Sequence, residues 1–206
     1  MKFKKEAKAA VPSQKEGAKS DTVHAVKLKS HEDALALFQT AKKRLMKIND
    51  WHQLCGMGTA TFALTDAEGK KIKRMAREGD YLRIDIPGPG SKTGTGYDWV
   101  RIKKILQETD QDRDYEATVI HVSPADNPRN NSSDTAHFFD QHASSTFLVT
   151  REKNVVTAEI HGRNEKPNTN PDSPLDVIRN TFIAIGAILG FSKMQWKRLA
   201  KGLLDK

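Results

Sequence analysis

The most informative stretch of this sequence is HAVKLKSHEDALALF, residues 24–38. Its first residues alternate between apolar and polar side chains, which is typical of a strand. Ser30 then stands three residues before Asp33, a spacing that lets a serine cap the first turn of a helix. Apolar side chains recur at helical spacing over residues 34–48. The stretch therefore predicts a strand over 23–29 that leads directly into a helix.

Beyond this helix the apolar pattern changes to the alternation that is typical of strands. Short runs rich in Val, Ile, Thr and aromatic residues follow one another, separated by turn residues. The turn between the last two runs, at residues 151–154, predicts a hairpin. We expect strands over residues 59–65, 71–76, 81–86, 97–106, 115–122, 144–150 and 154–162.

A long helix is expected at the end of the chain. It begins at Ser173 and Pro174, because serine is a favoured helix cap and proline is favoured at the first helical position. Its apolar face continues to Leu204. The sequence shows no repeat and no second apolar core, so residues 22–206 are expected to form a single α+β domain. Residues 1–21 contain few large apolar side chains, and they are expected to be a disordered basic tail.

The formal net charge of +8 is concentrated at the two ends of the chain. Residues 1–20 contain six lysines and two glutamates, and residues 188–206 contain five basic residues and one aspartate. The residues between them are neutral overall, with 23 basic and 23 acidic side chains. A basic patch would suggest a polyanionic partner. The neutral body carries no nucleic-acid motif, so nucleic acid is not the expected partner.

Several chemistries find little support in the residue types. Cys55 is the only cysteine, which excludes an internal disulfide and a zinc site built on paired thiolates. His137, Asp140 and His142 could be metal ligands, but nothing completes the shell of three or four ligands, so we predict no metal and no cofactor. The longest apolar tract, residues 177–191, is shorter than the roughly 20 residues of a membrane span. We expect a cytoplasmic protein without a transmembrane segment.

The order of elements resembles the helix-grip architecture of the START-like and birch-pollen-allergen-like superfamily, also called SRPBCC. The resemblance rests on the strand-to-helix stretch His24–Phe38, on Trp51 just past that helix, and on the last helix with WKRLAKGLL at 196–204. It implies a curved antiparallel sheet of about six or seven strands that wraps around the C-terminal helix. It also implies a cavity between them, which in many members binds lipids, polyketides or hormones.

Under this resemblance, aromatic and small residues are the candidates to line the cavity, because ligand sites bury most of the ligand surface against apolar side chains. A filled core is an equal alternative. An arginine in the cavity would suggest a ligand with an anionic head group. The candidate ligand-binding residues are Trp51, His52, Tyr81, Arg83, Trp99, Phe147, Phe182 and Gly186.

The predicted function is to hold an apolar or amphipathic, lipid- or polyketide-like molecule in the cavity. A first alternative is an enzyme of cyclase or hydrolase type, in which His52 or His121 transfers a proton. Since no nucleophile or partner acid can be identified beside either histidine, the sequence favours a protein without catalytic activity. A second alternative is weak electrostatic binding of nucleic acid or an anionic surface through the basic tail and the last helix. The oligomeric state is left open.

Overall fold

The structure is a computed structural model that describes residues 6–87, 94–130, 135–168, 190 and 192–205. Its described C-terminal helix covers residues 192–204. The other elements, in chain order, are α1 (Glu6–Ala9), β1 (Ala18–Lys27), α2 (His31–Met46), the short 3-10 helix η1 (Ile48–Asp50), α3 (Trp51–Cys55), β2 (Thr61–Thr65), β3 (Tyr81–Asp85), β4 (Asp98–Asp110), β5 (Tyr115–Pro124), β6 (Ser144–Glu152) and β7 (Val155–Glu165).

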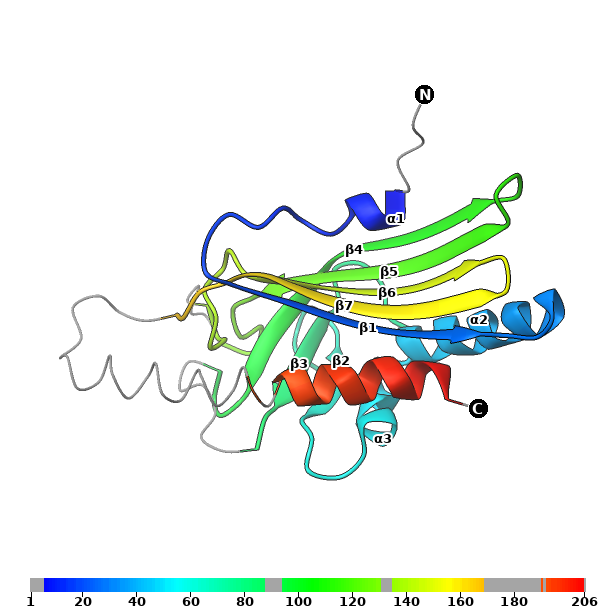
Figure 1. Cartoon of the computed structure of the whole chain (residues 1–206). Helices are drawn as coiled ribbons and strands as arrows, with labels where there is room; N and C mark the ends of the chain where they lie inside the picture. Colours follow the sequence, from blue (N-terminus) through cyan, green and yellow to red (C-terminus); the bar gives the residue numbers. More distant parts are fainter. Residues whose placement is uncertain (1–5, 88–93, 131–134, 169–189, 191, 206) are drawn as a thin grey trace.

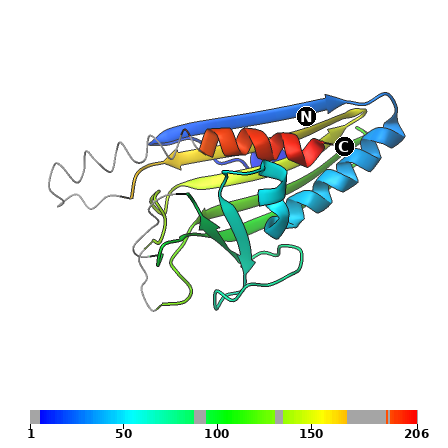
Figure 2. The ribbon, with the colours of Figure 1, turned by 90° about the horizontal axis from the view of Figure 1, so that it is seen from below.

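The seven strands form one antiparallel sheet in the order β1-β7-β6-β5-β4-β3-β2. The sheet is curved, and α2 and the C-terminal helix lie against one of its faces, which we call the inner face (Figures 1 and 2). The main core is formed between this face and the helices, with α1 on the opposite, outer face. This is the α+β helix-grip fold that the sequence predicts. Among the described residues, no helix is long and apolar enough to cross a membrane.

Helix α2 begins as its sequence predicts. The Ser30 backbone is extended, and its hydroxyl accepts a hydrogen bond of 3.0 Å from the backbone N–H of Asp33. This bond satisfies one of the free N–H groups in the first turn. The buried side chains of α2 repeat at helical spacing and pack into the main core; they are Ala34, Leu37, Phe38, Ala41, Leu45 and Met46.

The C-terminal helix docks on the end of α2 and on α3. The Arg44 guanidinium donates from Nη1 to the carbonyl oxygens of Gly202 (3.3 Å) and Leu203 (3.1 Å). A cation at this position satisfies free carbonyls and interacts favourably with the negative end of the helix dipole. Gly202 lies directly against the backbone of Leu54. The expected start of the helix at Ser173 lies outside the described residues.

Two expectations about local structure are wrong. Of the expected disordered tail, residues 6–21 are structured: α1 buries Ala7 against the outer face, and β1 begins at Ala18. Composition misses this segment because alanine fits closely on a sheet without supplying a large apolar side chain. The expected strand over 71–76 is reduced to an isolated bridge between Lys71 and Thr65.

Asp21 of β1 lies in a row of charged side chains on the β1–β7 pair. Its carboxylate contacts His161 Nδ1 (2.5 Å), Arg163 Nη2 (2.7 Å) and Lys19 Nζ (3.2 Å). Burial raises the pKa of Asp21, but the hydrogen bonds from these three side chains outweigh it and lower the pKa to about 2. The ionised carboxylate therefore stabilises the pairing of the edge strand.

Asp21→Asn is expected to lower the free energy of unfolding by about 1 kcal/mol at neutral pH, because the 38% exposed carboxylate is partly screened by solvent. A lowered pKa stabilises the fold above the usual value of 3.8, and this contribution is lost as the pH falls towards 2. Urea unfolding at pH 7, 4 and 3 should show the difference between the two proteins shrinking below pH 4. A difference that stays constant from pH 7 to pH 3 would contradict this role.

Candidate functional site

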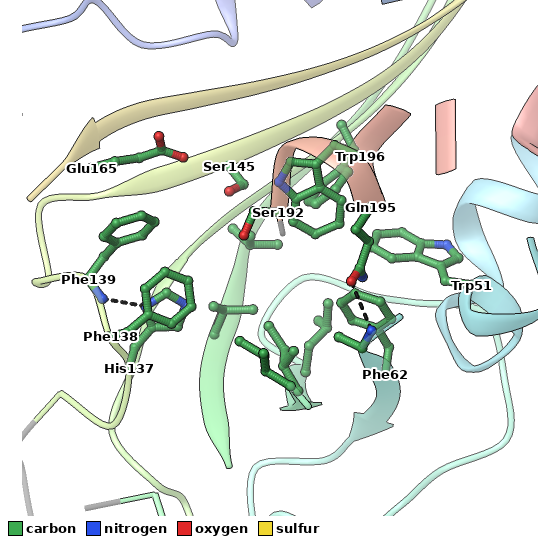
Figure 3. A pocket seen from close by; sticks show the side chains of 17 residues that line it. Trp51, Phe62, His137, Phe138, Phe139, Ser145, Glu165, Ser192, Gln195 and Trp196 are labelled. Atoms are coloured by element: carbon green, nitrogen blue, oxygen red, sulfur yellow. Dashed lines mark hydrogen bonds between the residues drawn. The ribbon is translucent and has the colours of Figure 1, made fainter. Parts of the chain in front are cut away.

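A cavity lies between the inner face of the sheet and the beginning of the described C-terminal helix (Figure 3). Its empty volume is about 620 Å³, part of which is open to solvent. Ligand sites in proteins are concave and have mainly apolar walls. The lining side chains are mostly apolar; they are Trp51, Ala60, Phe62, Leu82, Ile84, Ile86, Val100, Val122, His137, Phe138, Phe139, Ser145, Phe147, Glu165, Ser192, Gln195 and Trp196.

Four aromatic rings form one end of the cavity. The Trp51 ring lies 5.4 Å from the ring of Phe62 and 4.8 Å from that of Phe147, measured between centroids. Trp196 of the C-terminal helix lies 5.3 Å from Phe147 and 6.1 Å from Phe62. The Trp51 indole N–H donates to the carbonyl oxygen of Leu45 at 3.1 Å. This end is therefore a fixed apolar wall.

Gln195 joins the C-terminal helix to the start of β2. Its side chain is buried, and Oε1 accepts a hydrogen bond of 2.9 Å from the backbone N–H of Ala60 (Figure 3). Ser192 lies one turn earlier and also lines the cavity. The helix is thereby held at the edge of the cavity and brings two polar side chains to it.

The segment His137–Phe139 forms another wall. The Nδ1 atom of His137 accepts a hydrogen bond of 2.9 Å from the backbone N–H of Phe139, so the neutral ring carries its proton on Nε2. Burial lowers the pKa of His137 to about 3, which keeps the ring uncharged at neutral pH. The carboxylate of Asp98 accepts a hydrogen bond of 3.0 Å from the backbone N–H of Phe138. Burial raises the pKa of Asp98 to about 7.

Glu165 is the last residue of β7, and the backbone turns it into the cavity. Even-numbered β7 residues such as Ile160 belong to the main core, so strict alternation would place Glu165 on the outer face. Asn164 has a φ of 55°, which interrupts the alternation. Glu165 consequently lines the cavity, 7% exposed, and its Oε1 accepts a hydrogen bond of 3.2 Å from the Ser20 hydroxyl. Burial raises its pKa, against smaller opposing effects of Ser20 and Arg163.

Of the eight residues that the sequence analysis selects, Trp51 and Phe147 line the cavity. Tyr81 and Arg83 do not, because they alternate along β3 with Leu82 and Ile84, which do. Alternation along β4 likewise places Val100 at the cavity and its neighbour Trp99 on the other face of the strand. Phe182 and Gly186 lie outside the described residues.

The residues that turn away form a separate cluster. Tyr81 and Trp99 pack with Ala125 and Ala136 in a small apolar group of their own. The Arg83 guanidinium lies over the ring of Tyr97, 4.3 Å from its centroid. The expectation of an anionic head group beside Arg83 thus loses its structural basis.

The two histidines of the enzyme alternative also lie away from the cavity. His52 is half-buried in α3 and is not among the described lining residues. The Nδ1 atom of His121 lies 2.9 Å from the Thr146 hydroxyl, and its neighbour on β5, Val122, faces the cavity instead. The two histidines considered as metal ligands, His137 and His142, lie in different environments, because His137 is buried and His142 is exposed. Within the described part of the chain, no group of three or more His, Cys, Asp and Glu side chains could hold a metal ion.

Several lining residues were not selected from the sequence. Alternation places Phe62 on one face of β2, but the sequence does not reveal which face meets the helix. The orientation of Glu165 depends on the positive φ of Asn164, for which the asparagine itself is a weak local signal. Trp196 belongs to the stretch on which the resemblance rests, but it was not selected as a lining residue. The unselected residues with aromatic or polar side chains are Phe62, His137, Phe138, Phe139, Ser145, Glu165, Ser192, Gln195 and Trp196.

The architecture and the cavity define a class, the helix-grip α+β proteins with a cavity between sheet and helix. No protein-family model and no curated protein matches this sequence. Among solved structures, the chain is similar to a STAR-related lipid transfer protein from Xanthomonas axonopodis, with 13% identity over 90% of this chain and 86% of that chain, at a TM-score of 0.45.

Two plant proteins are also similar to this chain. Major latex-like protein 151 from Panax ginseng has 10% identity over 84% of this chain and 96% of that chain, with a TM-score of 0.32. Norcoclaurine synthase from Thalictrum flavum, in complex with dopamine and hydroxybenzaldehyde, has 9% identity over 89% of this chain and 88% of that chain, with a TM-score of 0.34. At these identities the likeness concerns the fold alone.

Proposed function

We propose that the protein binds an apolar or amphipathic, lipid-like small molecule in the cavity between the sheet and the C-terminal helix. The observation that carries this proposal is the cavity itself, a concave site with mainly apolar walls and a few polar side chains. Burial of apolar ligand surface contributes roughly 25 cal/mol per Å² before the costs of association are subtracted. The cavity walls supply the apolar surface that such binding requires.

The close packing of the aromatic end supports a cavity wall that is already formed before a ligand binds. The rings of Trp51, Phe62, Phe147 and Trp196 pack against one another, and the Trp51 indole is hydrogen-bonded to the end of α2. A wall that is ordered before binding reduces the entropy lost when a ligand enters. The cytoplasmic location and the electrostatic alternative remain predictions of the sequence.

A cavity-filling variant tests the proposal. Ser145→Phe places a ring into the cavity, whereas Thr61→Phe places the same ring at an exposed position on β2. Titration with the neutral fluorescent probe N-phenylnaphthylamine is expected to show binding by the unmodified protein and by Thr61→Phe. We expect Ser145→Phe to bind the probe at least about tenfold more weakly, because the ring occupies the ligand volume.

Circular dichroism and thermal unfolding should show that both variants are folded. Native mass spectrometry of the unmodified protein then checks for a ligand carried through purification. The proposal fails if the unmodified protein does not bind the probe, or if folded Ser145→Phe binds it as tightly as Thr61→Phe does.

A further inference from the structure

Glu165 is distinctive among the described side chains that line the cavity. It is the only aspartate, glutamate, lysine or arginine in that set. Its Oε1 atom is hydrogen-bonded to Ser20, but its buried Oε2 atom has no hydrogen-bond partner among the described residues. A buried polar atom without a partner costs about 1–3 kcal/mol. The structure thus contains an unused hydrogen-bonding group at the edge of an apolar cavity.

The space for this carboxyl group depends on a glycine. A Cβ atom at Gly162 would lie 2.0 Å from Oε1 of Glu165 and 2.3 Å from the Ser20 hydroxyl. Both distances are far below van der Waals contact, so any side chain at position 162 would displace the carboxyl group. Because Gly162 has no side chain, the side chains of Glu165 and Ser20 can occupy the space beside it on the inner face.

The turn that orients Glu165 is held by the segment before β1. The side-chain oxygen of Asn164 accepts hydrogen bonds from the backbone N–H groups of Lys15 (2.7 Å) and Glu16 (3.3 Å). The backbone N–H of Asn164 donates to the Gln14 side chain at 3.1 Å. These bonds hold Asn164 at its positive φ. The orientation of Glu165 is consequently fixed by a long-range contact, which acts together with the tolerance of asparagine for a positive φ.

The charges around the cavity define the ligand that fits beside Glu165. His137 is uncharged at neutral pH. The nearby Arg163 guanidinium is occupied, because it contacts Asp21 (2.7 Å) and donates to the carbonyl oxygens of Ser20 (3.0 Å) and Gly162 (2.7 Å). A ligand carboxylate or phosphate would meet no free cation among the described lining residues, and it would lie close to a carboxyl group. A ligand hydroxyl or ammonium group, by contrast, can donate to Oε2.

We propose that Glu165 anchors the polar end of the ligand, and that this end is a hydrogen-bond donor, a hydroxyl or an ammonium group, rather than an anion. The inference rests on the proposed function of the cavity and specifies the chemistry of its ligand. The apolar part of such a ligand lies among the aromatic and aliphatic walls. Its donor group satisfies the free oxygen of Glu165, with a stronger hydrogen bond when the donor is charged.

The test compares three probes of equal chain length: decanol, decylamine and decanoate. Each displaces bound N-phenylnaphthylamine from the full-length protein at neutral pH. We expect decanol and decylamine to bind at least about tenfold more tightly than decanoate. In Glu165→Gln, an isosteric change, the affinity for decylamine should fall about tenfold and the affinity for decanoate should rise. The affinity for decanol should change little, because the amide oxygen still accepts a hydrogen bond.

Glu68→Gln, at an exposed position of the turn after β2, is the matched control and should leave the order of the three probes unchanged. Gly162→Ala, which displaces the carboxyl group, should reproduce the loss of selectivity for decylamine. The anchor role is overturned if decanoate binds the unmodified protein as tightly as decanol does. It is also overturned if Glu165→Gln binds the three probes with the same relative affinities as the unmodified protein. Those outcomes leave the proposed function standing. If the unmodified protein binds neither N-phenylnaphthylamine nor any of the three probes, the anchor role and the proposed function are both overturned.

Discussion

Trp51→Ala is expected to lower the free energy of unfolding by about 4 kcal/mol, the cost of removing a large aromatic side chain from a packed core. Trp51 is completely buried, and its ring packs against Phe62 and Phe147. Its indole N–H donates to the carbonyl oxygens of Arg44 and Leu45. The side chain thus joins the end of α2 to the sheet, and alanine would leave a large void between them.

Trp51→Phe separates the contribution of ring packing from that of the indole hydrogen bonds. It keeps most of the ring volume and removes the indole N–H, so it should cost about 1–2 kcal/mol. Urea unfolding monitored by circular dichroism measures both variants on the same scale. A loss of less than about 1 kcal/mol for Trp51→Ala would show that the rings rearrange to fill the space, against the rigid wall described above.

Gly202→Ala should also destabilise the protein, by about 2–3 kcal/mol. A Cβ atom at this position would lie 2.6 Å from the Leu54 carbonyl oxygen and 2.9 Å from the Leu54 Cβ. The clash involves backbone atoms, which cannot move aside as a flexible side chain can. The C-terminal helix would have to shift away from α3, and the hydrogen bonds from Arg44 to its last carbonyls would weaken.

Lys201→Ala is the matched control, because Lys201 is the exposed neighbour on the same helix. We expect it to leave the free energy of unfolding within about 0.5 kcal/mol of the unmodified protein. Gly202→Ala should also weaken the binding of N-phenylnaphthylamine, since Ser192, Gln195 and Trp196 reach the cavity from this helix. Equal stability of the two variants would contradict the close approach of helix and α3.

Local sequence patterns account for most of the fold. The cap at Ser30 and the spacing of apolar side chains determine where α2 begins and which face it buries. Alternation identifies β2 to β7 because each strand has one face against the core. The same argument fails for residues 6–21, whose structure depends on contacts with the distant strands β4, β5 and β7.

The candidate site was less predictable than the fold. Trp51 and Phe147 were selected because aromatic side chains commonly line apolar ligand sites, and they line the cavity. Alternation states that Tyr81 and Leu82 face opposite ways, but it does not state which of them meets the helix. Tyr81 and Trp99 were selected as aromatic residues and Arg83 as a possible partner of an anionic head group, and the structure places all three away from the cavity.

The pairing of β1 with β7 has a consequence for how the protein folds. The Ser20–Glu165 hydrogen bond joins residues 145 positions apart in the sequence. Contacts between such distant residues form slowly, because most of the chain must be ordered first. During synthesis β1 emerges early and its backbone stays unpaired until β7 follows. The polar end of the cavity is therefore completed only when β7 pairs with β1, and Trp196 joins the aromatic wall later still, on the C-terminal helix. A chain halted before β7 would contain Trp51, Phe62 and Phe147, but neither Glu165 nor the helix that covers the cavity.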